Sequence, residues 1–121
     1  MTKKDRRTAE RLRPRKDMQL ILNCDRPMIG TVYDISSKGI AVEYEGACQI
    51  DIGCEVIVSI VNGGRNAEMI SDLHCIAVYN IPTLAQGRSF RGKNIHLLAM
   101  AYGDMDPVHS SRLNRLLEKL S

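Results

Sequence analysis

Aromatic residues are scarce in this sequence. Its 121 residues include no Trp, one Phe and four Tyr, although apolar residues make up 44% of the chain. A chain of this length can form one domain with a single core, which must therefore be mainly aliphatic. Proteins that bind single-stranded nucleic acid usually present aromatic side chains on which the bases stack. A small barrel that binds single-stranded nucleic acid is therefore a disfavoured alternative, and we do not expect nucleic acid as a partner.

The cysteines offer no standard metal site. There are four, at positions 24, 48, 54 and 75, and none of them forms a C-x-x-C pair. Cys48, Cys54, His74 and Cys75 would supply four zinc ligands, but their spacing matches no standard zinc-binding pattern. We therefore expect no metal and no cofactor, and we interpret the cysteines as small buried thiols.

Catalytic and targeting signals are also lacking. The sequence has no apolar run of membrane-spanning length and no secretory signal, so we expect a cytoplasmic protein without a membrane contact. His74, His96 and His109 do not form a set of nucleophile, base and orienting residue at any interpretable spacing. Phosphodiester hydrolysis would need a metal cluster of histidines and carboxylates. We therefore expect no catalytic residues and no enzyme activity.

Positive charge is concentrated at the N-terminus. Residues 1–16 contain eight basic residues against Asp5 and Glu10, a net charge of +6, which leaves −3 for residues 17–121. A protein that binds nucleic acid over its whole surface would be basic throughout. We predict a flexible basic arm over residues 1–16 and one folded domain over residues 17–121. A solvated tail without a binding role is the alternative for the arm.

Alternating apolar residues predict six strands. "MQLIL" places Met18, Leu20 and Leu22 on one face. Turn-forming stretches such as "NCDRP" and "NGG" separate neighbouring strands and indicate hairpins. A mainly β fold is therefore predicted, in the form of a closed or nearly closed six-stranded antiparallel barrel. The predicted strands span residues 18–22, 29–35, 39–46, 55–61, 68–81 and 95–102. In the second strand, the residues expected to share one face are Ile29, Thr31, Tyr33 and Ile35, with Val32 on the other.

The C-terminus changes to a helical period. Asp106 is a favoured N-cap residue, and the Pro that follows it suits the first helical position. The apolar residues that then recur at i, i+3, i+4 and i+7 are Leu113, Leu116, Leu117 and Leu120. This pattern predicts one amphipathic helix over about residues 106–120, which packs on the barrel or, alternatively, forms a dimer or partner surface.

The stretch "RLRPR" is suited to holding an anion. Arg11 and Arg15 are separated by three residues, and Pro14 disfavours helix at Arg13, so the segment is expected to be extended or turned. The guanidinium group of arginine stays charged and presents its N–H donors in a rigid, planar, fork-like arrangement. This fork can hold a phosphate, or the O6 and N7 edge of a guanine, through two parallel hydrogen bonds.

The stretch "DISSKG" follows the second predicted strand. The carboxylate of Asp34 can accept hydrogen bonds from N1 and N2 of a guanine, and Ser36 offers a short hydroxyl. Gly39 permits a positive φ or a close backbone approach. By itself, such a stretch is most often a turn with a capping acid.

Together, the two stretches resemble the motifs of the PilZ family, whose members are receptors for the bacterial second messenger cyclic di-GMP. The family's R-x-x-x-R motif is matched by Arg11 and Arg15, and its D/N-x-S-x-x-G motif by Asp34, Ser36 and Gly39. The resemblance covers essentially the whole chain. It implies a six-stranded split barrel with a trailing helix, no enzyme activity, and cyclic di-GMP bound by these five residues.

Two features depart from the family pattern. Arg7 and Arg11 form a second R-x-x-x-R pair, so the register of the first motif is open, although the strand that follows favours Arg11 with Arg15. Near the last strand, where family members often have Gly and Phe, this chain has Asn94 and Leu97. Further candidate contacts to the ligand are Arg7, Arg13 and Ser37.

The resemblance also implies how such a receptor would act. The basic arm is expected to close over cyclic di-GMP, and the altered surface is expected to signal to a separate protein partner of unknown identity. The resemblance implies that the pathway regulates motility, exopolysaccharide or virulence-type functions. A PilZ-like module that binds only protein, without nucleotide, is the remaining alternative.

Overall fold

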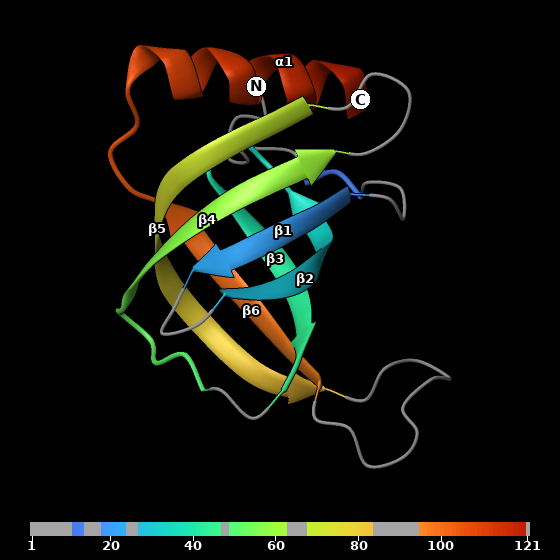
Figure 1. Ribbon diagram of the computed structural model, residues 1–121, viewed down its shortest axis with the longest axis vertical. Coiled ribbons are helices and arrows are strands. Elements are labelled where there is room, and N and C mark those ends of the chain that lie inside the picture. The colour runs from blue at the N-terminus through green and yellow to red at the C-terminus, as the bar shows by residue number, and fades with distance from the viewer. Residues whose placement is uncertain are drawn as a thin grey trace, which may run out of the picture.

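The fold is a closed antiparallel barrel with one helix across its end (Figure 1). The computed structural model describes residues 11–13, 18–23, 27–46, 49–62, 68–83 and 95–120. The strand order is β1-β2-β3-β6-β5-β4, and β4 pairs with β1 to close the barrel. The predicted six-stranded barrel with a C-terminal helix is thus confirmed. The elements are β1 (Met18–Asn23), β2 (Pro27–Ile35), β3 (Gly39–Glu45), β4 (Glu55–Asn62), β5 (Glu68–Thr83), β6 (Ile95–Tyr102) and α1 (Pro107–Leu120).

The core fills the barrel with aliphatic side chains. On β1, the alternation read from the sequence is observed, because Met18, Leu20 and Leu22 are all buried and their neighbours are more exposed. The same alternation places Ile40 and Val42 of β3 in the core. Burial of apolar side chains at about 25 cal/mol per Å² is the main stabilising contribution in a domain of this kind.

A β-bulge in β2 changes which residues face the core. The pairing with β3 shifts between Val32 and Asp34, so Tyr33 is the extra residue of the bulge. Val32 and Ile35 are therefore both buried, whereas Ile29 is 65% exposed. The prediction that Ile35 shares a face with Ile29 and Tyr33 was wrong, because one inserted residue reverses the alternation beyond it. Tyr33 and Asp34 consequently lie on neighbouring positions of the outer surface.

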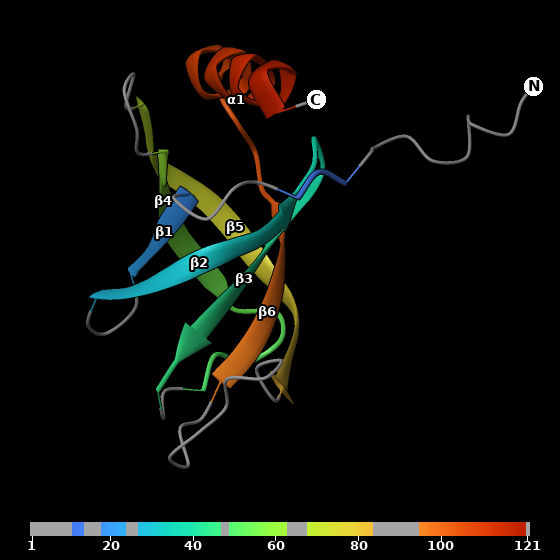
Figure 2. The same cartoon turned by 90° about the vertical axis from the view of Figure 1, so that its right-hand side faces the viewer.

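Helix α1 covers one end of the barrel (Figures 1 and 2). Leu113 and Leu116 are buried in the core cluster that also contains the barrel residues. The predicted N-cap is present, because the backbone N–H of His109 donates a hydrogen bond of 2.8 Å to Oδ1 of Asp106. This bond lowers the pKa of the Asp106 carboxyl. The cap therefore contributes stability above the usual pKa of an Asp and loses it as the pH falls through the lowered value.

The two cysteines within the described residues differ in their environment. Cys75 is fully buried on β5, and burial raises the pKa of its thiol to about 12. Cys54 is exposed, so the prediction of a buried thiol was wrong there. The reason is local: Cys54 ends the turn before β4, where its N–H donates to the carbonyl of Asp51 at 3.1 Å. Cys24 and Cys48 lie outside the described residues.

Within the described residues, no three His, Cys, Asp or Glu side chains come together in a way that could hold a metal ion. No helix found there has the length and apolar character needed to cross a bilayer.

Candidate ligand-binding site

Residues 11–13 pair with the end of β2 (Figure 2). The N–H of Leu12 donates to the carbonyl of Ile35 at 2.8 Å, and the N–H of Ile35 donates to the carbonyl of Leu12 at 3.0 Å. Leu12 packs against the core. Successive side chains of an extended segment point to opposite sides, so Arg11 and Arg13 project from the outer surface of the barrel, where both are exposed.

Arg11 and Asp34 bring the two sequence motifs together. The Arg11 guanidinium lies 2.7 Å from Oδ1 of Asp34, although the two residues are 23 positions apart in the chain. The Asp34 side chain is only 13% exposed, whereas that of Arg11 is 59% exposed. A guanidinium has five N–H donors and a carboxylate has two oxygens. The pair can therefore stay in contact while each partner also binds a further group.

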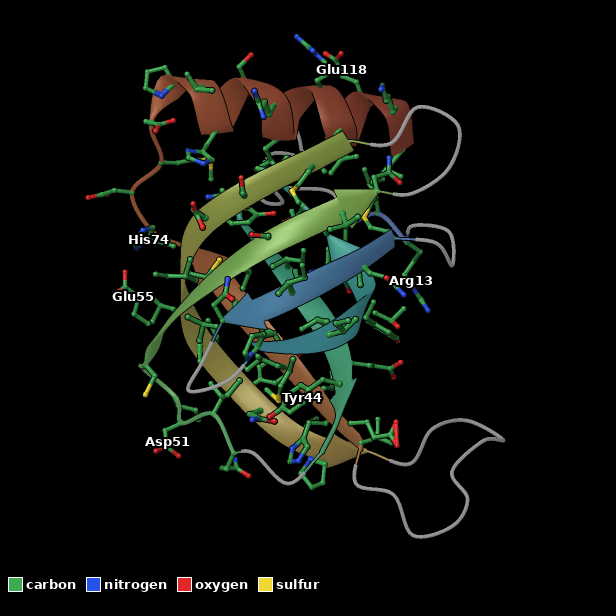
Figure 3. The ribbon with its side chains drawn as sticks, viewed as in Figure 1. Arg13, Tyr44, Asp51, Glu55, His74 and Glu118 are labelled. Atoms are coloured by element: carbon green, nitrogen blue, oxygen red, sulfur yellow. The ribbon has the colours of Figure 1, made fainter. Side chains whose placement is uncertain are left out.

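Arg13 lies over the ring of Tyr33. Its guanidinium carbon is 4.2 Å from the ring centroid, which is a cation–π contact. Tyr33 faces outward because it follows the buried Val32, and the bulge keeps the next residue, Asp34, on the same outer side. Figure 3 shows Arg13 on the outer side of the barrel. This arginine was a secondary candidate from the sequence, and the contact with Tyr33 places it next to the Asp34 position on β2.

Ser36 shapes the turn between β2 and β3. It is 2% exposed, and its hydroxyl oxygen accepts hydrogen bonds from the N–H groups of Lys38 at 3.0 Å and Gly39 at 3.2 Å. The hydroxyl thus holds the turn, and the expected contact of Ser36 with a ligand stays a prediction. Ser36 therefore fixes the backbone that follows Asp34. The neighbouring Ser37 is exposed at the tip of the turn.

Tyr102 of β6 supports the same turn and was not found from the sequence. Its hydroxyl donates to the carbonyl of Ser36 at 3.0 Å, and its N–H donates to the carbonyl of Lys38 at 3.2 Å. Burial raises the pKa of the Tyr102 phenol, so the hydroxyl stays protonated and can act as a donor. The turn is thus held from inside by Ser36 and from β6 by Tyr102.

Gly39 is needed for a close approach between two strands. A Cβ atom at this position would lie 2.3 Å from the carbonyl oxygen of Met100 on β6. The glycines with positive φ in the described residues are Gly46 and Gly53. Of the two reasons expected from the sequence, close approach is therefore the one observed, and the approach is to β6.

Arg7 and Arg15 lie outside the described residues. The choice between Arg7 with Arg11 and Arg11 with Arg15 therefore stays a prediction. Arg11 is common to both registers, so the contact between the two motifs does not depend on that choice.

The three histidines all make contacts within the fold. Nδ1 of His74 lies 2.7 Å from the carboxylate of Glu55 at the surface, and Figure 3 shows the two together at one side of the barrel. His96 stacks on Tyr44, with ring centroids 4.8 Å apart and planes at 10°. His109 lies beside the cap of α1. Each histidine thus has at least one side-chain contact within the part of the chain described.

The fold is that of solved PilZ domains. The PilZ domain of YcgR from Escherichia coli with cyclic di-GMP superimposes with a TM-score of 0.71 at 15% identity, over 95% of this chain and 91% of that one. MrkH from K. pneumonia in its apo state gives a TM-score of 0.71 at 11% identity, over 92% of this chain. This chain spans about half of the MrkH chain, 49%.

A second YcgR structure, described as a complex with cyclic di-GMP, gives a TM-score of 0.68 at 13% identity. No protein-family model and no curated protein sequence matches this chain. At these low identities the likeness concerns the fold, and it shows that the chain is a PilZ-like domain in architecture.

Proposed function

We propose that this chain is a receptor for cyclic di-GMP. The observation that carries the proposal is the 2.7 Å contact between Arg11 and Asp34, one residue from each of the two motifs. The fold supports it, because the solved structures with this architecture include the PilZ domain of YcgR with cyclic di-GMP.

The pair has the chemistry that a guanine nucleotide requires. Arg11 supplies charge-assisted donors to a phosphate or to the O6 and N7 edge of guanine. Asp34 supplies acceptors to the N1 and N2 groups of guanine, which adenine does not present in the same way. The low exposure of the Asp34 side chain, 13%, strengthens these bonds because it lowers the local dielectric.

Other motif residues have supporting roles in this proposal. Ser36 and Gly39 hold the turn and the strand that position Asp34, as their contacts within the fold indicate. Arg15 supplies the second guanidinium of the motif. The secondary contacts to the phosphates are assigned to Arg7, Arg13 and Ser37.

Titration calorimetry with the purified protein tests the proposal. Cyclic di-GMP is expected to bind saturably, and cyclic di-AMP is expected to bind at least about 100-fold more weakly, because it lacks the guanine edge that the site is built to recognise. Cyclic GMP and GTP keep that edge but lack the second cyclic-linked nucleotide, so they are expected to bind more weakly than cyclic di-GMP as well. Equal binding of all four would indicate a diffuse electrostatic attraction. Absence of cyclic di-GMP binding would reject the receptor in favour of a PilZ-like module that binds only protein.

The output of the receptor is proposed to be a change at the N-terminal arm. Residues 1–16 carry a net charge of +6, and the part described is attached to β2 through Leu12. Two phosphates near Arg11 would attract the rest of this arm and alter the surface offered to a protein partner. Trypsin cleavage within residues 1–16 is therefore expected to slow when saturating cyclic di-GMP is present. Equal cleavage rates with and without the nucleotide would contradict the change at the arm.

A further inference from the structure

We propose that two copies of this chain associate through the surface where α1 lies along β5, in a two-fold arrangement that sets the basic end of each copy against the acidic end of the other. Residues 69–74 of β5 form this surface together with residues 104–115 before and within α1, and we call it the α1–β5 seam. None of the described motif residues lines either cavity of the seam. The association therefore goes beyond the proposed function and does not require the nucleotide.

Two contacts fix how α1 lies along β5. Nε2 of His109 lies 2.7 Å from the carbonyl oxygen of Ser71, and Nη1 of Arg112 donates to the carbonyl oxygen of Met69 at 3.4 Å. As the numbers rise along α1, they fall along β5, so the helix and the first part of the strand run alongside each other in opposite directions (Figure 1). The order of side chains along the seam is thereby set on both elements.

One end of the seam is basic. A cavity of about 240 Å³ lies there between the two elements, and Met69, Ile70, Arg112 and Arg115 line it. Both arginines are exposed, and Met69 is 49% exposed. In the described part of the chain, neither guanidinium forms an ion pair with a carboxylate. This end therefore presents two positive charges that the fold leaves uncompensated, beside an apolar side chain.

The other end of the seam is acidic. A second cavity, of about 530 Å³, is lined by Asp72, Asp104 and Asp106 together with His74 and His109. The Asp106 carboxylate is used within the fold, because it caps α1 and contacts His109. The carboxylates of Asp72 and Asp104 are exposed, and neither forms an ion pair with another described residue. Two uncompensated negative charges thus stand opposite the two positive ones.

A second copy of the chain is the partner that this pattern fits. The two ends are separated by roughly 10 Å along β5, from Met69 to Asp72 at about 3.3 Å per residue. A two-fold rotation places the basic end of one copy on the acidic end of the other, and each contact then occurs twice. A partner of one sign would be attracted to one end and repelled by the other. Val108 is 60% exposed and lies between Asp106 and Arg112 on α1, where it can add an apolar contact near the two-fold axis.

Sedimentation velocity over a range of protein concentrations, without nucleotide, tests the dimer. The wild type is expected to dimerise at about 0.1 M salt and to do so more weakly at about 1 M, because the screening length falls from about 10 Å to about 3 Å. Arg115→Glu and Asp104→Lys are each expected to raise the dissociation constant of the dimer at least about tenfold, since each reversal creates two contacts between like charges.

Asp51→Lys is the control for Asp104→Lys. It makes the same change of charge at an exposed residue, and Figure 3 shows Asp51 at the end of the barrel away from α1. Its dissociation constant should be within about twofold of the wild-type value, since an exposed charge outside the interface is largely screened. If Asp51→Lys weakened the dimer as much as Asp104→Lys, net charge alone would govern the association and the seam would be wrong.

Mixing the two seam variants gives the sharpest test. The acid introduced at position 115 of one chain then faces the base introduced at position 104 of the other, so an equimolar mixture of Arg115→Glu and Asp104→Lys should dimerise although each variant alone is monomeric. A mixture that stays monomeric would overturn the two-fold pairing. A wild type that is monomeric at every concentration would overturn the dimer in favour of a different protein partner. Thermal unfolding checks that each variant is folded, and should Arg115→Glu not fold, Asp104→Lys against Asp51→Lys still decides.

Discussion

Replacing Arg11 by Ala is expected to lower the affinity for cyclic di-GMP about 30- to 1000-fold. Loss of one charge-assisted, bidentate partner of a phosphate or guanine corresponds to roughly 2–4 kcal/mol of binding free energy. Folding should be affected less than binding, because the Arg11 side chain is 59% exposed and solvent screens much of its attraction to the less exposed Asp34. Calorimetric titration gives the affinity, and a urea unfolding curve gives the stability.

Arg115→Ala is the control for the loss of one positive charge. Arg115 is exposed on α1, away from the β2 position of Asp34, and its replacement should change the affinity by less than about fivefold, an effect that salt removes. If Arg11→Ala and Arg115→Ala had the same effect, Arg11 would contribute only to the general electrostatic attraction of the anionic ligand.

Comparison of Arg7→Ala with Arg15→Ala then decides the register of the first motif. A loss confined to Arg7→Ala would move the motif to Arg7 and Arg11.

Replacing Gly39 by Ala is expected to destabilise the fold strongly. The added Cβ would lie 2.3 Å from the carbonyl oxygen of Met100, and this neighbour is backbone within the β3–β6 pairing. The strands must separate locally, which places the loss of unfolding free energy at the upper end of the range for overpacking, about 3 kcal/mol. The midpoint of urea unfolding should fall accordingly, and binding should be lost because Asp34 is positioned by the pairing of β2 with β3.

Ser37→Ala changes an exposed side chain of the same turn and should leave the unfolding midpoint within error of the wild type. An unchanged midpoint for Gly39→Ala would mean that the two strands can separate at no cost. The glycine of the motif would then serve the ligand rather than the barrel. The two variants thus separate a role in the fold from a role in binding.

The barrel could be predicted from the sequence because each strand carries its own signal. Met18, Leu20 and Leu22 occupy every second position of β1, and the turn residues mark where each strand ends. The β2 bulge could not be predicted, because the residue types around it are those of an ordinary strand. The extra residue becomes visible only when Val32 and Asp34 are seen to pair with successive residues of β3. The exposure of Cys54 could not be predicted for the same reason. Cys54 lies in a turn that is held by backbone hydrogen bonds to Ala77 of β5.

The site was predictable in its residue types and not in its geometry. The spacing within each motif indicated Arg11 and Asp34, but their contact depends on the pairing of Leu12 with Ile35. The support of the turn by Tyr102 is still less visible in the sequence, because its hydroxyl reaches the carbonyl of Ser36 across 66 residues of the chain. Features that depend on register between distant strands need the structure.

Backbone amide chemical shifts, followed by NMR during a titration with cyclic di-GMP, test the central claim most directly. A ligand held by Arg11 and Asp34 should perturb the amides of Leu12, Ile35 and Gly39 most strongly and should leave those of β1 and β4 nearly unchanged. Perturbations centred on β1, β4 or α1 would contradict the proposed site, and the absence of any perturbation at saturating nucleotide would contradict the receptor itself.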